Sequence, residues 1–188
     1  MLGIVALAAA GAATYIVIAK PPIFDFINDK INGIITPKPY DGNLMPARDI
    51  TGTWVSSLRG KGFQLYGQFV AGGATTKAYE DGDIELKIDK VEGNIASGQI
   101  RYTNMCAWAQ TTAPVVGTIT APKQCTNSGF SPVSIRVSSS SLDFGKISTD
   151  GVTATMQGSY TTDIMSGTMT ITTAYGVIKG EFHLVRQH

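Results

Sequence analysis

The sequence predicts an all-β protein whose main domain is an antiparallel barrel, closed or nearly closed, of eight or nine strands. Three observations predict this fold. Apolar and polar residues alternate in short runs after residue 46, and turn-forming residues separate these runs. In several runs an inward glycine is followed, two positions later, by a large apolar residue. A hydrophobic helix and a short amphipathic helix are expected to precede the barrel.

The first 19 residues carry no charged side chain, and the run ends at Lys20. A helix of that length would measure about 28 Å, which is enough to cross the core of a bilayer. We therefore expect residues 1–20 to form a retained transmembrane helix whose partner is membrane lipid. The small residues Val17 and Ala19 would also suit the cleavage of a signal peptide before Lys20.

An amphipathic helix is predicted over residues 21–35, followed by a proline-rich linker over 36–46 and the barrel domain over 47–188. This helix either packs on its own domain or lies against a membrane or a partner subunit. Residues 1–35 are accordingly the expected site of contact with protein partners or of self-assembly. The residues that would form the contact recur at helical spacing: Ile23, Phe24, Ile27, Ile31, Ile34 and Ile35.

Strands are predicted wherever the period of two is clear, as in residues 83–91, 131–137 and 152–160. Turn signals divide them, among them "TDG" and "AYG". The run "EDG", residues 80–82, is interpreted in the same way as a hairpin turn. The expected inward residues are mostly large: Leu65, Phe69, Ile84, Leu86, Ile88, Ile100, Tyr102, Met156, Tyr160, Met165, Met169, Phe182 and Leu184.

Glycine is a poor strand residue, so its repeated place on the inward face needs a physical reason. A sheet that closes on itself must bend sharply, and a missing side chain on the concave face permits the bend. We interpret the repeat as a signature of barrel closure. The glycines concerned are Gly52, Gly67, Gly98, Gly158, Gly167 and Gly180.

The run "ITGTW" at residues 50–54 resembles the opening strand of the calycin barrels, the lipocalin and avidin group. The resemblance implies that an Arg from the last strand packs across this Trp and closes one end of the barrel. Arg186 is in phase with the inward residues of the last strand, so we expect it to contact Trp54. The avidins bind biotin with an Asn and a Ser at positions that here hold Ser56 and Gly60, so biotin binding is not implied. The second tryptophan, Trp108, is placed in an irregular region.

Cys106 and Cys125 are expected to form one disulfide, closing a loop of about 20 residues and stabilising the fold by roughly 3 kcal/mol. Two unrelated buried thiols are the alternative. A disulfide indicates an oxidising compartment, so the domain is placed outside the cytoplasm, at the cell surface or in a periplasm-like space. Lys20 and Lys30 follow the predicted helix and favour the opposite orientation, but two lysines are a weak signal.

The charge pattern, with a net charge of +1, excludes a nucleic-acid footprint. No nucleophile motif, phosphate loop or metal-ligand spacing occurs, and His183 falls on the polar face of the last strand. No catalytic residue, cofactor or metal ligand is therefore predicted. These patterns favour a non-catalytic structural or accessory subunit of a membrane assembly or surface filament. The alternative is a tethered or secreted lipocalin-like carrier of a small apolar ligand, although the large inward residues predict a barrel without a ligand of its own.

Overall fold

The computed structural model describes residues 5–6, 15–16, 49–149, 152–173 and 176–188. Near the N-terminus, Val5–Ala6 (β1) pairs antiparallel with Tyr15–Ile16 (β2). Apart from these four residues, the helices predicted over 1–20 and 21–35 and the linker over 36–46 lie outside the described residues and stay predictions. The described part of the chain has no helix with the length and apolar character needed to span a bilayer.

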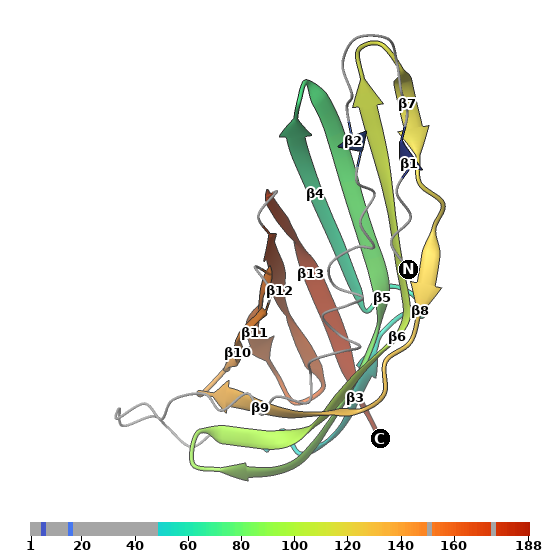
Figure 1. The fold of residues 1–188 in the computed structure, drawn as a ribbon. Helices are drawn as coiled ribbons and strands as arrows, with labels where there is room; N and C mark the ends of the chain where they lie inside the picture. The colour runs from blue at the N-terminus through green and yellow to red at the C-terminus, as the bar shows by residue number, and fades with distance from the viewer. Residues whose placement is uncertain (1–4, 7–14, 17–48, 150–151, 174–175) are drawn as a thin grey trace.

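The main domain is a closed antiparallel barrel of eight strands with three additional strands, as the sequence predicts (Figure 1). The ring runs β4–β5–β6–β9–β10–β11–β12–β13 and returns to β4. The strands are β3 (Gly52–Ser56), β4 (Phe63–Ala71), β5 (Ala74–Glu92), β6 (Ile95–Ala113), β7 (Gly117–Thr120), β8 (Gln124–Thr126), β9 (Ser131–Val137), β10 (Ser141–Thr149), β11 (Val152–Tyr160), β12 (Ile164–Thr173) and β13 (Gly176–Gln187).

The three additional strands continue the ring strands rather than forming a separate layer. β3 and β4 both pair with β5 and β13, so they share one place in the ring. β7, β8 and β9 pair in turn with successive parts of β6 and act as one interrupted strand. Apart from the closing pair, in which β13 meets β3 and β4, neighbours in the ring are therefore consecutive along the chain. This up-and-down order is consistent with a calycin-like architecture.

The hairpin turn predicted at residues 80–82 is wrong, because β5 runs through it without a break. Asp81 pairs with Cys106 and Asp83 with Thr103, so β6 carries one extra residue at this point. The local turn signal therefore marks a β-bulge in a long hairpin. Asp83 stabilises the bulge by accepting hydrogen bonds from the Gly60 N–H (2.6 Å) and from Asn104 Nδ2 (2.7 Å).

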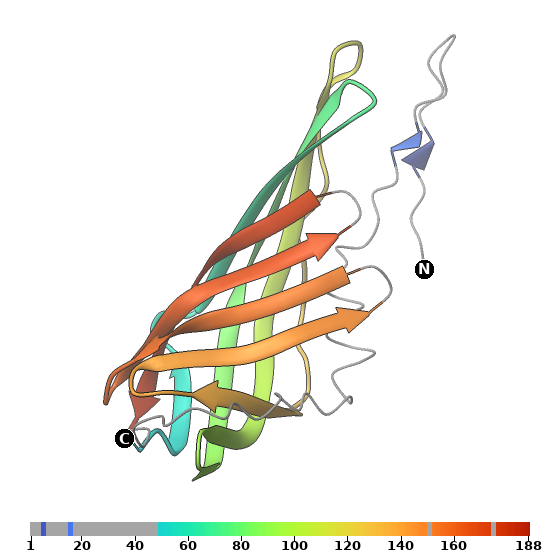
Figure 2. The same cartoon turned by 90° about the vertical axis from the view of Figure 1, so that its left-hand side faces the viewer.

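The upper parts of β4, β5, β6 and β7 form a sheet extension that rises beyond the rest of the barrel (Figures 1 and 2). β13 pairs with β4 only as far as Gly67, whereas β4 and β5 stay paired up to Ala71 and Ala74. We call the end of the barrel that carries this extension the wide end. Trp108, predicted in an irregular region, instead lies within β6 on the outer face of the barrel, just below the extension.

The hydrophobic core lies inside the ring. The inward residues expected from the alternation are buried, apart from Phe69, which is partly buried. Five of the six glycines predicted to face inward occur where neighbouring strands come very close; the sixth, Gly52, is exposed, and a Cβ added there would meet nothing within 4 Å. Gly158 and Gly167 are paired directly, and a Cβ added to Gly167 would lie 2.4 Å from the Gly158 Cα. Any larger residue would therefore push β11 and β12 apart, which supports the interpretation of these glycines as closure residues.

The end of the barrel opposite the wide end contains the predicted contact between Trp54 and Arg186. Trp54 is fully buried, and its Nε1 donates a hydrogen bond to the Ile50 carbonyl at 2.9 Å. Arg186 is the cross-strand partner of Trp54, with its Cζ 4.8 Å from the centroid of the Trp54 ring. Its Nη2 donates to the Asp49 carbonyl at 2.7 Å. We call this end the closed end, and the contribution of Arg186 to its stability is a prediction.

Trp54→Ala is expected to lower the free energy of unfolding by about 3 to 5 kcal/mol, as for other large buried aromatics. Arg186→Ala should cost less, and the double variant should lose less than the sum because the two side chains share one contact. Denaturant unfolding of the four proteins measures the coupling. Lys179→Ala, on the outer face of β13, serves as the control and should be additive with Trp54→Ala. If the losses in free energy of unfolding for Trp54→Ala and Arg186→Ala were additive as well, the proposed stabilising contact between the two side chains would be contradicted.

Candidate functional site

The inner wall of the barrel contains a buried carboxyl group, that of Glu80. Its neighbours across the strands are Leu65 on β4 and Ala107 on β6, both buried in the interior. The side chain of Glu80 is only 3% exposed, and its Oε1 has no hydrogen-bond partner among the described residues. Buried polar atoms in folded proteins are nearly always paired, so this exception needs an explanation.

The electrostatic surroundings keep this group protonated. Burial raises the pKa of Glu80 to about 8, and the neighbouring charge of Asp81 raises it as well. Burial also raises the pKa of Tyr102, to which the charge of Glu80 adds. At pH 7 the interior therefore presents a neutral carboxylic acid and a neutral phenol. Each can donate and accept a hydrogen bond.

Small residues surround Glu80 on the inner face. Gly67, Ala78 and Ala109 lie on the same face as its direct neighbour Ala107. Closer to the wide end, the hydroxyl groups of Thr76 and Thr111 are hydrogen-bonded to each other at 2.9 Å. The closed end, in contrast, is filled by large side chains, namely Trp54, Phe63 and Phe182. On β5 and β6, polar groups and small side chains are thus concentrated in the half of the interior nearer the wide end, whereas Ile171 and Ile178 fill the same half from β12 and β13.

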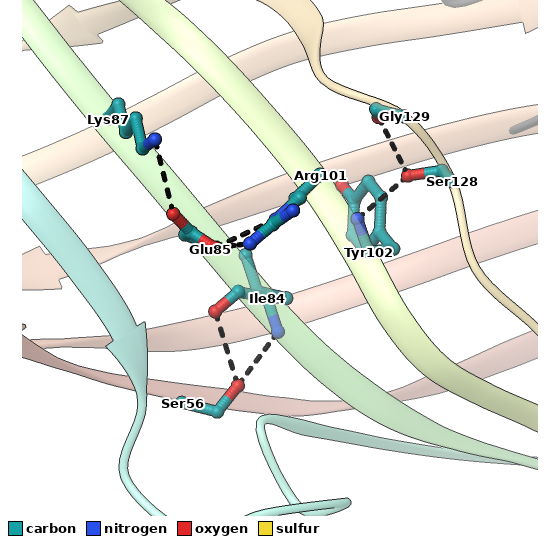
Figure 3. A network of polar contacts seen from close by, with 8 residues as sticks. All are labelled: Ser56, Ile84, Glu85, Lys87, Arg101, Tyr102, Ser128 and Gly129. Carbon is teal, nitrogen blue, oxygen red and sulfur yellow. Dashed lines mark hydrogen bonds and ion pairs between the residues drawn. The ribbon is translucent and has the colours of Figure 1, made fainter.

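The backbone of Tyr102 is fixed by the segment that joins β8 to β9 (Figure 3). The Tyr102 N–H donates to Ser128 Oγ at 2.8 Å, and the Ser128 N–H donates to the Tyr102 carbonyl, also at 2.8 Å. Inside the barrel, the ring of Tyr102 meets that of Phe63 edge to face, with centroids 6.1 Å apart. These contacts hold the phenol in one place before any ligand binds.

The outer face of the same strands carries a separate polar network (Figure 3). Glu85 on β5 pairs with its cross-strand neighbour Arg101 and with Lys87. Both cations also lie over the ring of Phe130, at 4.4 and 4.5 Å from its centroid. Ser56 accepts a hydrogen bond from the Ile84 N–H at 2.7 Å and so joins β3 to β5. This network holds strands together and presents no unpartnered group.

Three aromatic rings form a ladder across the outer face of the barrel just below the extension, where β13 still pairs with β4: Tyr66 on β4, Tyr79 on β5 and Trp108 on β6. Tyr79 stacks on Trp108 with an interplanar angle of 8°, and its ring centroid is 5.2 Å from that of Tyr66. Lys123 covers the far side of Trp108 at 4.5 Å from the ring centroid and pairs with Asp81 at 3.1 Å. Cross-strand contacts of this kind stiffen a sheet.

The predicted disulfide between Cys106 and Cys125 is confirmed. The two residues are direct partners on β6 and β8, with Cα atoms 4.0 Å apart. It therefore clamps β8 to the wall of the barrel beside the aromatic ladder. The other residues named from the sequence are elsewhere: His183 is exposed beside Glu181, and the apolar residues of 21–35 lie outside the described residues.

Glu80 was missed because "EDG" was interpreted as a turn. The signal was nevertheless present, since the inward phase of Ile84, Leu86 and Ile88 continues upstream through Gly82 to Glu80 and Ala78. In the described part of the chain, no three acidic, His or Cys side chains come together as a metal site would require. Comparison of the chain with protein-family models, with curated proteins and with solved structures found no match. The geometry around Glu80 is therefore the basis for the function proposed below.

Glu80→Gln is expected to change how stability depends on pH. Between the usual carboxyl pKa of 4.5 and the raised value of about 8, the folded protein keeps a proton that the unfolded chain has lost. The free energy of unfolding should therefore fall as the pH rises through this range. The variant lacks this titration, so its stability relative to the wild type should grow by up to about 5 kcal/mol between pH 4 and pH 9.

Denaturant unfolding at several pH values measures this difference. Glu92→Gln, which removes an exposed carboxyl paired with Lys90, is the matched control and should follow the wild-type curve. If Glu80→Gln followed the wild-type curve as well, Glu80 would have an ordinary pKa and the buried position would be contradicted.

Proposed function

We propose that the protein is a non-catalytic binding protein whose barrel holds one small, mainly apolar molecule through a polar group placed against Glu80. The observation that carries this proposal is the buried Glu80 Oε1, which has no hydrogen-bond partner among the described residues. An apolar body would lie among the aliphatic side chains of the interior. A donor on the ligand would reach the carboxyl group, and Tyr102 supplies a second polar contact.

Energetics support a functional role for this acid. A buried polar group without a partner costs about 1 to 3 kcal/mol of stability. Leu or Met at position 80 would avoid that cost and pack well among Leu65 and Ala107. A costly residue placed among small side chains and near a fixed phenol is typical of a binding site.

The hydrogen bonding of the ring supports access to the interior. β9 and β10 are joined by only two residue pairs, Leu142 with Val137 and Asp143 with Arg136. Beyond them, the rest of β10 has no strand partner on that side among the described residues, and neither do β7 and β8 on the side away from β6. These edges diverge toward the wide end (Figure 1). Strands without shared hydrogen bonds can separate to admit a ligand at little cost.

The sequence and the disulfide support a place for the protein in the cell. The calycin resemblance is carried by "ITGTW" and Arg186, and small-molecule carriage is common in the lipocalin branch of that group. The hydrophobic run 1–20 supports attachment to a membrane, and the disulfide supports an extracytoplasmic barrel. The proposal is thus a tethered carrier or receptor for an amphiphilic small molecule.

A second function, as a structural or accessory subunit of a membrane assembly or surface filament, is favoured by the outer surface. The ladder of Tyr66, Tyr79 and Trp108 stiffens the strands at the base of an extension whose edges have no strand partner among the described residues. Aromatic residues on a rigid exposed sheet suit contact with a partner protein. The amphipathic run 21–35 would supply further contacts with partners or with other copies of the chain. A subunit of this kind can also hold a ligand, so the two functions are compatible.

Ligand binding is tested on the protein purified in mild detergent from its natural source. Native mass spectrometry should show a bound small molecule, and titration with retinol or a dansyl-labelled fatty acid should show saturable binding at micromolar concentration. Glu80→Ala should weaken the binding about tenfold, equivalent to about 1.4 kcal/mol, because the polar contact is lost. Glu92→Ala should leave the affinity unchanged.

Two results would contradict the proposal. One is an empty barrel by mass together with no saturable binding of either probe. The other is binding that Glu80→Ala does not alter. An empty barrel in a protein that elutes as part of a large complex would favour the accessory-subunit function instead.

A further inference from the structure

The two hairpin tips of the sheet extension contain no charged residue. Residues 68–76, at the turn between β4 and β5, read "QFVAGGATT", and residues 110–122, around the turn between β6 and β7, read "QTTAPVVGTITAP". Val70 is 71% exposed, while Val115 and Val116 are 89% and 42% exposed. Turns in water are commonly formed by polar residues, so exposed valines on two uncharged tips are unusual.

We propose that these two tips insert into the interfacial region of a lipid membrane with anionic headgroups. This is a contact separate from the ligand site at Glu80 and from the predicted helix over residues 1–20. Its occupant is the lipid surface itself, which accepts small aliphatic side chains without demanding a complementary shape.

The fold brings the tips together at one end of the molecule. β5 and β6 remain paired as far as Thr75 and Thr112, so the turns that follow are neighbours. Both tips project beyond the ring in two perpendicular views (Figures 1 and 2). A third apolar residue, Val177 at the start of β13, is exposed at the same end. A membrane approached from this side meets the valines first.

The charges behind the tips complement an anionic surface. The nearest charged residues along the described strands are Lys77 on β5, Lys123 between β7 and β8, and Lys179 on β13, all exposed. Among the described residues of β4 to β7, the nearest acids are Glu80, which is buried, and Asp81, which is paired with Lys123. Lys77 lies three positions along β5 from Ala74, or about 10 Å. Tips buried by about 5 to 10 Å would bring the ammonium group of Lys77 to the level of the lipid phosphates, with Lys179 further from the membrane.

The composition of the tips favours lipid over a protein partner. Protein interfaces depend on a few anchors, most often Trp, Tyr and Arg. The two tip sequences contain none of these, and their one aromatic residue, Phe69, packs toward the core. What remains is a strip of Val, Ile, Ala, Pro, Gly and Thr with one Gln at the start of each tip, which can enter the headgroup region but offers a protein little to recognise.

Depth-dependent quenching on the full chain tests this contact. The chain is reconstituted into vesicles of phosphatidylcholine and phosphatidylglycerol, with part of the phosphatidylcholine brominated in its acyl chains. Val115→Trp and Val70→Trp report on the tips, and Ile164→Trp, a 51% exposed position at the closed end, is the matched control. Trp54, Trp108 and the N-terminal segment are common to all three proteins, so their contributions to fluorescence and to its quenching are the same in each.

The tip tryptophans should shift to shorter emission wavelengths on vesicles, and bromolipid should quench them about three times more strongly than Ile164→Trp. Adding Val115→Asp and Val116→Asp to the Val70→Trp protein should abolish the excess quenching. Both positions are exposed, so thermal unfolding should be unchanged. Vesicles of phosphatidylcholine alone, or Lys77→Gln with Lys179→Gln, should also weaken the quenching because the headgroup attraction is lost.

Quenching of the tip tryptophans no stronger than that of Ile164→Trp would overturn the proposal, even if the chain were bound to the vesicles through its N-terminus. A blue shift that appears without lipid and grows with protein concentration would also overturn it. That result would mean that the tips are covered by protein.

Discussion

The bulge opposite Asp81–Asp83 is the constraint on which the rest of the structure depends. One extra residue in β6 lets both Tyr102 and Ala107 face the interior, although they are an odd number of positions apart. Asn104 absorbs the extra residue with a φ of 50°, a conformation that Asn tolerates better than most residues. Without the bulge, every residue of β6 beyond this point would change face, and Trp108 would point into the barrel.

The bulge also separates two regions with different packing. Toward the closed end the interior is filled by aromatic and branched side chains, and the sheet is closed on itself with Trp54 buried under Arg186. Toward the wide end the inner residues of β5 and β6 are mostly small, with Glu80 among them, whereas those of the facing strands, such as Ile171 and Ile178, are large. The outer aromatic ladder and the disulfide stiffen the strands just below the sheet extension. Stability is thus concentrated at one end and the candidate binding groups at the other.

Sequence reasoning recovered the features that depend on local pattern. Alternation identified the strands and the inward face, the glycine repeat indicated a closing sheet, and the "ITGTW" run with Arg186 pointed to the contact at the closed end. It failed where a local signal has two structural meanings. Asp and Gly favour a turn and a bulge alike, and the choice at Asp81–Gly82 is made by pairing with β6, more than 20 positions away along the chain. Misplacing that segment hid Glu80 and left Trp108 without a strand.

The central claim is that the bulged hairpin holds the Glu80 carboxyl inside the barrel in its protonated form. The most direct measurement is a titration of the side-chain carboxyl carbons by NMR on protein labelled with ¹³C-glutamate. The Glu80 signal is assigned by its absence from Glu80→Gln. The account predicts a midpoint near pH 8 for this signal, well above the usual value of 4.5. A midpoint near 4.5 would mean that the carboxyl group is in water, and it would contradict both the buried site and the function proposed from it.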